Sequence, residues 1–103
     1  MGSSLKSIIC EDLTYCIICG ARAERHHVFG ASNRHKSTKD GLIIPLCAVH
    51  HREGPDAVHV NPTTMALCHI IGQLAWEANN RKAFEDTEYV RERFRKRYGK
   101  NYI

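Results

Sequence analysis

The sequence predicts a small α+β fold, with short strands in the first half of the chain and one to two helices in the second half. Three observations favour this class. The chain has 103 residues, which suits one compact domain and is too few for two. Pairs of metal-ligating side chains lie among short apolar runs in residues 5–60, and apolar residues recur at helical spacing in residues 61–103. We therefore expect a single domain over 1–103, with a metal-stapled core at 5–60 and a helical extension at 61–103.

Composition narrows the class of protein. The chain holds five cysteines, an odd number that argues against a disulfide framework and favours metal ligation with one or two thiols left over. No stretch approaches the roughly 20 apolar residues that cross a bilayer, and the start lacks the features of a secretory signal. We therefore expect a cytoplasmic protein without membrane contact, in which residues 1–4 are a flexible start outside the fold.

Charge alone does not decide function. The net charge of +4 is modest, and basic residues are concentrated in residues 81–100. Such a run fits a polyanionic partner, and it equally fits a solvated helix face.

Short elements are expected around the ligand pairs. An extended strand is expected over 24–29, followed by a polar, basic loop over 30–41 without periodicity. The apolar run 42–47 contains a proline and suits an edge strand or the second arm of a hairpin. A short helical segment over 48–53 is expected to stop at the Gly-Pro pair that follows it.

Two helices are expected in the second half. Asn61-Pro62 is a favourable helix start, and the apolar residues that follow it recur at helical spacing. A second helix is expected from a cap at Asp86 or Thr87 to about Tyr98. Both helices should pack on the front half through their apolar faces.

Two ligand pairs have the spacing of a zinc site. They are Cys16-x-x-Cys19 and Cys47-x-x-His50. Three thiolates and one imidazole would close a tetrahedral shell around a structural Zn²⁺, leave no position for water and convert binding energy into folding energy. The alternative is that one pair is an accident of buried cysteines. Of the remaining thiols, Cys68 is expected to be a small buried hydrophobe, whereas Cys10 could replace a ligand or do nothing.

Histidines that the predicted zinc site does not use gather around it in the sequence. They are His26, His27, His51 and His59, with Asn33 and Asp40 between them. A lone histidine is most often an ordinary surface or core residue, whereas four beside a metal scaffold indicate a second site.

These residues resemble those of the HNH endonucleases, the ββα-metal group. The resemblance covers about residues 15–59. It depends on His26-His27 at the end of a strand and on Leu46-Cys47-Ala48-Val49-His50-His51 at the start of a helix. Over nearly the whole chain the sequence also looks like a group of short phage-encoded HNH-like proteins. The shared segments are Lys6-Ser7-Ile8, His26-His27-Val28-Phe29-Gly30 with Asn33-Arg34, and Tyr98-Gly99-Lys100-Asn101-Tyr102. The resemblance implies a ββα-metal core.

The resemblance also implies roles for the histidines. In the family, the first residue of the strand pair binds the catalytic metal, and the histidine after it is the general base. A histidine just after the second zinc pair completes the metal site. Carried over to this chain, His26 and His51 are metal ligands, His27 is the general base and His50 is reserved for zinc.

Two positions depart from the family pattern. Leu42 stands where the family has its middle asparagine, so the task of orienting the base passes to Asp40 or to Asn33. Asp40 is the preferred candidate, because a carboxylate could accept a hydrogen bond from the imidazole. Pro55 stands where the DNase colicins have a further ligand, and His59 is expected either to reach into the metal site instead or to make a structural hydrogen bond.

The activity implied by the resemblance is metal-dependent hydrolysis of DNA phosphodiester bonds. Weak sequence preference is expected, because no element that reads bases is recognisable, and nicking rather than a double-strand break is expected if the protein acts as a monomer. Mg²⁺ or Mn²⁺ is the expected catalytic ion, and nitrogen ligands make Ni²⁺, Co²⁺ or Zn²⁺ feasible. Arg34, Lys36 and Lys39 are candidates for contact with DNA phosphates. The implied partners are DNA and phage DNA-processing proteins, in a bacterial or phage-infected cell.

Other functions compete with this one. A non-catalytic zinc module could bind nucleic acid or a phage protein, with the extra histidines as hydrogen-bonding residues, and a second metal per chain would distinguish the nuclease from it. A metallohydrolase or deaminase acting on a small molecule or a base is a further alternative. The deaminase signature needs a His-x-Glu motif ahead of a cysteine pair, and none is present there. RNA remains an alternative substrate to DNA.

Overall fold

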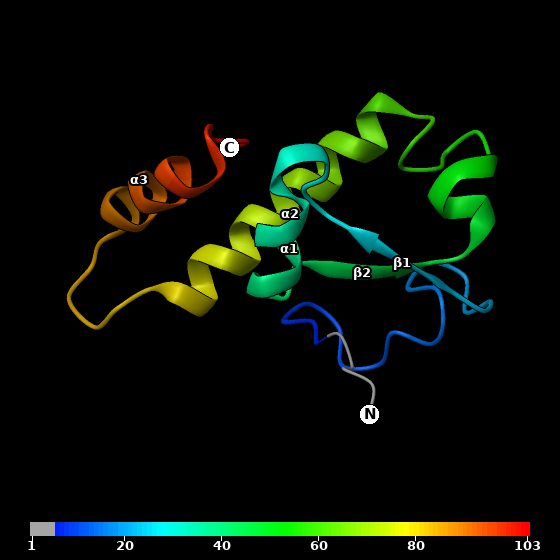
Figure 1. Cartoon of the computed structure of the whole chain (residues 1–103), viewed down its shortest axis with the longest axis horizontal. Helices are drawn as coiled ribbons and strands as arrows, with labels where there is room; N and C mark the ends of the chain where they lie inside the picture. Colours follow the sequence, from blue (N-terminus) through cyan, green and yellow to red (C-terminus); the bar gives the residue numbers. More distant parts are fainter. Residues whose placement is uncertain (1–5) are drawn as a thin grey trace.

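The computed structural model describes residues 6–103, so the expectation for residues 1–4 lies outside the described residues. The elements, in chain order, are β1 (Glu24–His27), the 3-10 turn η1 (Ala31–Asn33), α1 (Arg34–Asp40), β2 (Ile43–Leu46), the π-helical turn η2 (Val49–Glu53), α2 (Pro62–Asn80) and α3 (Thr87–Tyr98). The strands and η2 lie on one side of the molecule and α3 on the other, with α1 and α2 between them (Figure 1). The expected α+β class is confirmed. Within residues 6–103, no helix has the length and apolar character needed to cross a membrane.

The sheet consists of β1 and β2, paired antiparallel, with His26 opposite Ile44 and His27 opposite Ile43. Because side chains alternate along a strand, Glu24 and His26 project to one face of the sheet and His27 to the other. The strand is two residues shorter than the expected 24–29, since the chain turns towards η1 after His27.

The polar segment 30–41 is helical, and the expectation of a loop there is wrong. Its helix α1 buries only Ser37, so no apolar periodicity marks it in the sequence. The Ser37 hydroxyl donates to the Leu42 carbonyl at 2.8 Å and accepts from the Phe29 amide at 3.3 Å. Gly41, in the left-handed region at φ 74°, ends the helix and returns the chain to β2.

Both expected C-terminal helices are confirmed. The Asn61 side chain caps α2 by accepting from two backbone amides of the first turn, and the Asp86 side chain caps α3 by accepting from the backbone amide of Tyr89. Gly99, at φ 94°, ends α3. Helix α2 approaches the end of β1 closely at Gly72, where a Cβ atom would lie 2.5 Å from Cγ1 of Val28.

One hydrophobic core joins the front half to the helices. Its members run along the chain from Cys16 to Tyr98 and include the fully buried Phe29 and Phe94. The Phe29 ring lies 5.6 Å from that of Phe94 and 4.7 Å from that of Tyr98, measured between centroids. Packing at these distances holds α3 against the segment that carries the strand histidines.

Candidate metal centres

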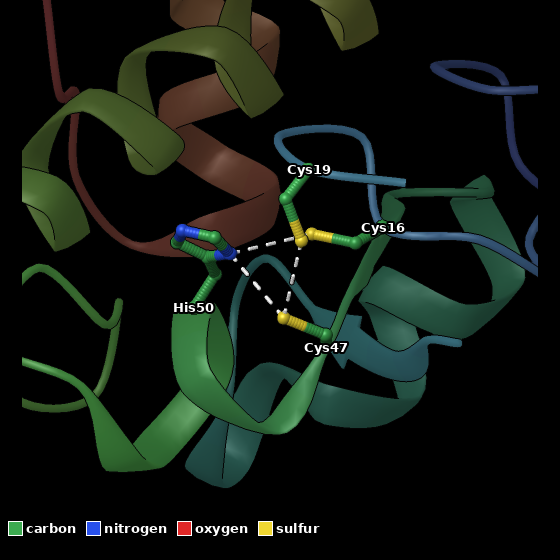
Figure 2. A group of neighbouring side chains, drawn as sticks. All are labelled: Cys16, Cys19, Cys47 and His50. Atoms are coloured by element: carbon green, nitrogen blue, oxygen red, sulfur yellow. Dashed lines mark hydrogen bonds between the residues drawn. The ribbon is translucent and has the colours of Figure 1, made fainter. Parts of the chain in front are cut away.

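The two ligand pairs predicted from their spacing, Cys16 with Cys19 and Cys47 with His50, meet in space. Cys16 and Cys19 lie on the turn before β1, and Cys47 and His50 lie where β2 passes into η2. One ligand atom from each of the four lies within 4.8 Å of the other three. Figure 2 shows the side chains converging from these two segments.

Distances within this group suit a tetrahedral metal ion. Sγ of Cys19 is 3.6 Å from Sγ of Cys47, and Nδ1 of His50 is 3.6 Å from Sγ of Cys16 and 3.3 Å from Sγ of Cys47. With zinc bonds of about 2.0 to 2.3 Å, neighbouring ligand atoms of a tetrahedral shell are roughly 3.5 to 3.8 Å apart. The donor set and its spacing therefore fit a metal ion such as zinc.

Local electrostatics favour the thiolate at Cys16 and Cys47. Burial raises the pKa of the Cys16 thiol, but backbone hydrogen bonds from Cys47, Cys19 and Ile18 outweigh it and lower that pKa to about 6. A hydrogen bond from the backbone of His50 is the main cause that lowers the pKa of the Cys47 thiol. At Cys19 a backbone hydrogen bond from Ala21 lowers the pKa, but the hydrogen bond with Cys47, burial and the neighbouring Cys16 outweigh it and raise that pKa. Thiolate is the form in which cysteine ligates a metal.

The other two cysteines lie outside the group. Cys68 is buried on α2 among core residues, as expected, and burial raises the pKa of its thiol. Cys10 is half-buried, and burial raises its pKa as well. The four predicted residues complete the group without either thiol.

Three of the remaining histidines form a second group. His26 on β1, His51 on η2 and His59 on the segment before α2 each place a ring nitrogen within 4.8 Å of the other two. Nε2 of His51 is 3.1 Å from Nε2 of His59, and the His26 ring centroid lies 5.2 Å from that of His51 and 5.0 Å from that of His59. Three converging nitrogen donors could hold a metal ion, and a tetrahedral ion would keep a fourth position open.

His26 has an unsatisfied buried nitrogen. Its side chain is 2% exposed, and its Nε2 has no hydrogen-bond partner within residues 6–103. Burial, together with the nearby imidazoles of His51 and His59, lowers the pKa of His26 to about 3, which keeps the ring neutral. Leaving a buried polar atom without a partner is costly. A metal ion held by the three rings would give this nitrogen a partner.

Glu24 is a residue of this site that sequence reasoning missed. Its Oε1 lies 2.8 Å from Nδ1 of His51, and its Oε2 lies 2.7 Å from Nη2 of Arg52. The hydrogen bonds from Arg52 and then from His51 lower the pKa of Glu24 to about 2. An ionised carboxylate only accepts, so Nδ1 of His51 carries the proton and Nε2 offers its lone pair. The available signal was position, because Glu24 precedes His26 by one strand repeat and shares its face.

His27 lies on the opposite face of β1 and is half-buried. Burial lowers its pKa, and the charge of Arg34 and the imidazole of His51 add to this. A neutral imidazole of this kind can accept a proton at neutral pH. The predicted base therefore lies on the other face of β1 from the three-histidine group, and it is near enough to Arg34 and His51 for them to lower its pKa.

None of the hydrogen bonds of residues 6–103 is the one between Asp40 and His27 that was expected from the sequence. The Asp40 carboxylate instead accepts from Nε1 of Trp76 at 3.0 Å, from Arg97 at 2.6 and 2.8 Å and from the Tyr98 hydroxyl at 2.6 Å. These bonds tie the end of α1 to α2 and α3. The prediction that Asp40 orients the base is corrected on this ground, because both its oxygens are committed to packing.

Asn33, the other candidate for that task, is also engaged elsewhere. Its side-chain amide donates to the Tyr98 carbonyl at 3.1 Å. Asp40 and Asn33, the two candidates for orienting the base, therefore hydrogen-bond α1 and η1 to the end of α3.

The predicted phosphate-binding side chains do not form one cluster. Arg34 begins α1 and is close enough to His27 to affect its pKa. Nζ of Lys36 donates to the Arg97 carbonyl at 2.8 Å. The Lys36 side chain also lines a hollow of about 630 Å³ between α1, α2 and α3. Lys39 is exposed near the end of α1. Of the three, Arg34 is the one with an effect on a predicted site histidine, His27.

Comparison of the chain with protein-family models, with curated proteins and with solved structures gave no match.

Proposed function

We propose that the chain is a metal-dependent endonuclease of the HNH type, which hydrolyses DNA phosphodiester bonds around a zinc-stabilised core. One observation carries the proposal. His26, His51 and His59 converge within 4.8 Å, and His27 follows His26 directly on the same strand. Three converging ligands, with a neutral imidazole on the adjacent residue of the same strand, supply candidates for the metal site and the general base of metal-assisted hydrolysis.

The two metal groups suit different tasks. The group of Cys16, Cys19, Cys47 and His50 offers four donors, which close a tetrahedral shell and leave no position for a substrate. The three-histidine group offers fewer protein donors, so a phosphate oxygen can complete its coordination. We assign a structural zinc to the first group and the catalytic divalent ion to the second.

Each requirement of phosphodiester hydrolysis has a candidate in the chain. When bound, the divalent ion neutralises charge on the phosphate and stabilises the departing oxygen. His27 accepts the proton of the attacking water at a ring nitrogen. Glu24 holds the His51 ring in one orientation, and Arg34 can contact a phosphate next to the scissile bond.

The donor set bears on the choice of ion. Imidazole nitrogens suit Zn²⁺, Ni²⁺ and Co²⁺ and are compatible with Mn²⁺, whereas Mg²⁺ prefers oxygen ligands. We therefore expect activity with Mn²⁺, Co²⁺ or Ni²⁺ to exceed activity with Mg²⁺.

The test is nicking of supercoiled plasmid by zinc-loaded protein with each of these ions. His27→Ala is expected to lower the rate by at least about a hundredfold, because a general base contributes about 10²- to 10⁴-fold. His35→Ala is the matched control, since His35 is exposed on α1 and belongs to neither metal group. Nicking by the wild type and the control that is lost in His27→Ala supports the proposal. Equal rates in all three proteins would contradict it.

A second candidate function is a non-catalytic zinc module that binds nucleic acid or a phage protein. The engagement of Asp40 and Asn33 elsewhere favours it, because His27 then lacks the orienting partner expected of a general base. This module would show no cleavage of duplex or single-stranded DNA or of RNA with any of the ions, while still retaining its zinc.

A further inference from the structure

Helix α2 carries an apolar stripe on the side that faces away from the core. Its core-facing side holds Cys68, Gly72 and Trp76, all buried. The opposite side presents Leu67, Ile71 and Leu74 at helical spacing, and these side chains are 55%, 47% and 49% exposed. Thr63 and Ala78 continue the same line towards the two ends of the helix, and both are exposed. We call these five residues the α2 stripe.

The exposed surface of α2 also lacks charge. The helix contains one residue among Asp, Glu, Lys and Arg, which is Glu77, and that residue is buried and paired with Arg91. Charged residues make up 25% of the whole chain. A helix that faces water normally carries charged or polar side chains opposite its apolar face, so this surface has the composition of a contact rather than of a solvated face.

The α2 stripe is symmetric along the helix except at Ile71, whose mirror position is the half-buried Ile70 just outside the stripe. About the point between Ile70 and Ile71, the position of Leu67 mirrors that of Leu74, and Thr63 mirrors Ala78. The large side chains therefore lie at the centre and the small ones at both ends. A surface that matches itself when reversed is what contact across a two-fold axis requires.

We propose that α2 forms a homodimer interface, on which a second copy of the chain packs its own α2 in the antiparallel direction. The two-fold axis passes between Ile70 and Ile71, and Leu67 contacts the partner's Leu74. Each chain has a net charge of +4, but the five residues of the α2 stripe carry no charge, so packing of one stripe on the other brings no like charges together.

The size of the surface predicts a reversible dimer. A helix of 19 residues is about 28 Å long, and two such helices alone fall short of the roughly 1,000 Å² typical of a stable interface. A groove of about 240 Å³ between α2 and α3 widens the contact, because Leu74 and Ala78 of the stripe also line it with Thr87 and Arg91. We expect a dimer that dissociates on dilution.

The three-histidine group stays accessible in this dimer. His59 lies just before α2, so the two histidine groups would lie at opposite ends of the helix pair, about 28 Å apart along its axis. The inference does not depend on catalysis, because it concerns only the exposed face of α2.

Sedimentation of the purified zinc-loaded chain over a range of protein concentration tests the interface. The wild type is expected to shift from monomer to dimer as concentration rises. Leu74→Glu should weaken dimerisation by at least about tenfold, since it places a charge in the centre of the contact. Asn79→Glu puts the same charge on α2 outside the stripe and should dimerise like the wild type. Circular dichroism and zinc content confirm that each variant is folded.

A charge-swap pair tests the orientation. Leu67→Lys alone should weaken the dimer, and combining it with Leu74→Glu should restore dimerisation, because the antiparallel packing sets each introduced charge against an opposite one. Parallel packing would oppose like charges and give no rescue. A chain that is monomeric at all concentrations, a dimer unaffected by Leu74→Glu, or the absence of rescue would overturn the proposal.

Discussion

Glu24 on β1 and His51 on η2 are joined by a hydrogen bond of 2.8 Å between Oε1 and Nδ1, across 27 positions of sequence. The bond fixes the proton on Nδ1 and leaves Nε2 to face Nε2 of His59. Carboxylate partners of this kind orient metal-binding histidines in proteins. The three-histidine group is thus supported by a residue outside it.

Replacing this carboxylate should weaken metal binding. Glu24→Gln is expected to lower the affinity of the three-histidine group for Ni²⁺ by about 10- to 100-fold, as loss of such partners does elsewhere. Calorimetric titration with Ni²⁺ of protein that holds one zinc per chain, in the cysteine group, measures this. Glu53→Gln is the control, because Glu53 also pairs with Arg52 but not with His51. Equal affinities in the two variants would show that Glu24 does not support the site.

Removing one thiolate should unfold the front half. Cys47→Ser is expected to lose the structural zinc and to lower the melting temperature markedly, because binding energy of a structural zinc is folding energy. Cys10→Ser, whose thiol lies outside the group, should keep the structural zinc and melt close to the wild type. Zinc content and thermal melting followed by circular dichroism report both effects. A Cys47→Ser protein that keeps its zinc and its melting temperature would contradict the assignment.

A methyl group at Gly72 should destabilise the packing of α2 on the end of β1. The added Cβ would lie 2.5 Å from Cγ1 of Val28 and 3.1 Å from Cε2 of Phe29. Crowding of this kind costs about 1 to 3 kcal/mol. Gly30→Ala is the matched control, since, apart from Gly30 itself and its two chain neighbours, no atom of residues 6–103 would lie within 4 Å of the added Cβ. The free energy of unfolding of this variant should differ from that of the wild type by less than about 0.5 kcal/mol. Urea denaturation compares the two, and equal stabilities would contradict the predicted close approach.

Asp40 should matter for stability and not for catalysis. Asp40→Asn leaves Arg97 without its carboxylate partner and is expected to cost roughly 2 to 3 kcal/mol, less than for a fully buried pair because the Arg97 side chain is 33% exposed. Glu92→Gln, in the exposed pair with Arg95, should cost under about 1 kcal/mol. Urea denaturation measures both. The nicking rate of folded Asp40→Asn should equal that of the wild type, and a large loss would restore a role for Asp40 in the site.

The parts of the fold and site that the sequence predicted depend on local signals. Cys16-x-x-Cys19 and Cys47-x-x-His50 were recognisable because zinc spacing is set by short segments of chain. The cap at Asn61 and the end of α3 at Gly99 were recognisable because helix ends need particular residue types. The metal-ligand roles of His26 and His51 were implied by the resemblance to the HNH endonucleases, and His59 was left open between a ligand and a structural role.

The parts of the fold and site that the sequence did not predict depend on contacts between residues that are far apart in the sequence. Helix α1 has only Ser37 buried, and what fixes the helix is the bonding of Ser37 to Phe29 and Leu42. Asp40 was expected beside His27 from its place in the sequence, yet its partner Arg97 lies 57 positions away. No periodicity or spacing encodes such a pair.

The number of metal ions bound per folded chain tests the central claim most directly. Native mass spectrometry of the protein equilibrated with Zn²⁺ should give two ions for the wild type and for His35→Ala, and one ion for His51→Ala, which keeps the ion held by the cysteines. A single ion in the wild type, or two ions in His51→Ala, would contradict the assignment of a second metal site to His26, His51 and His59.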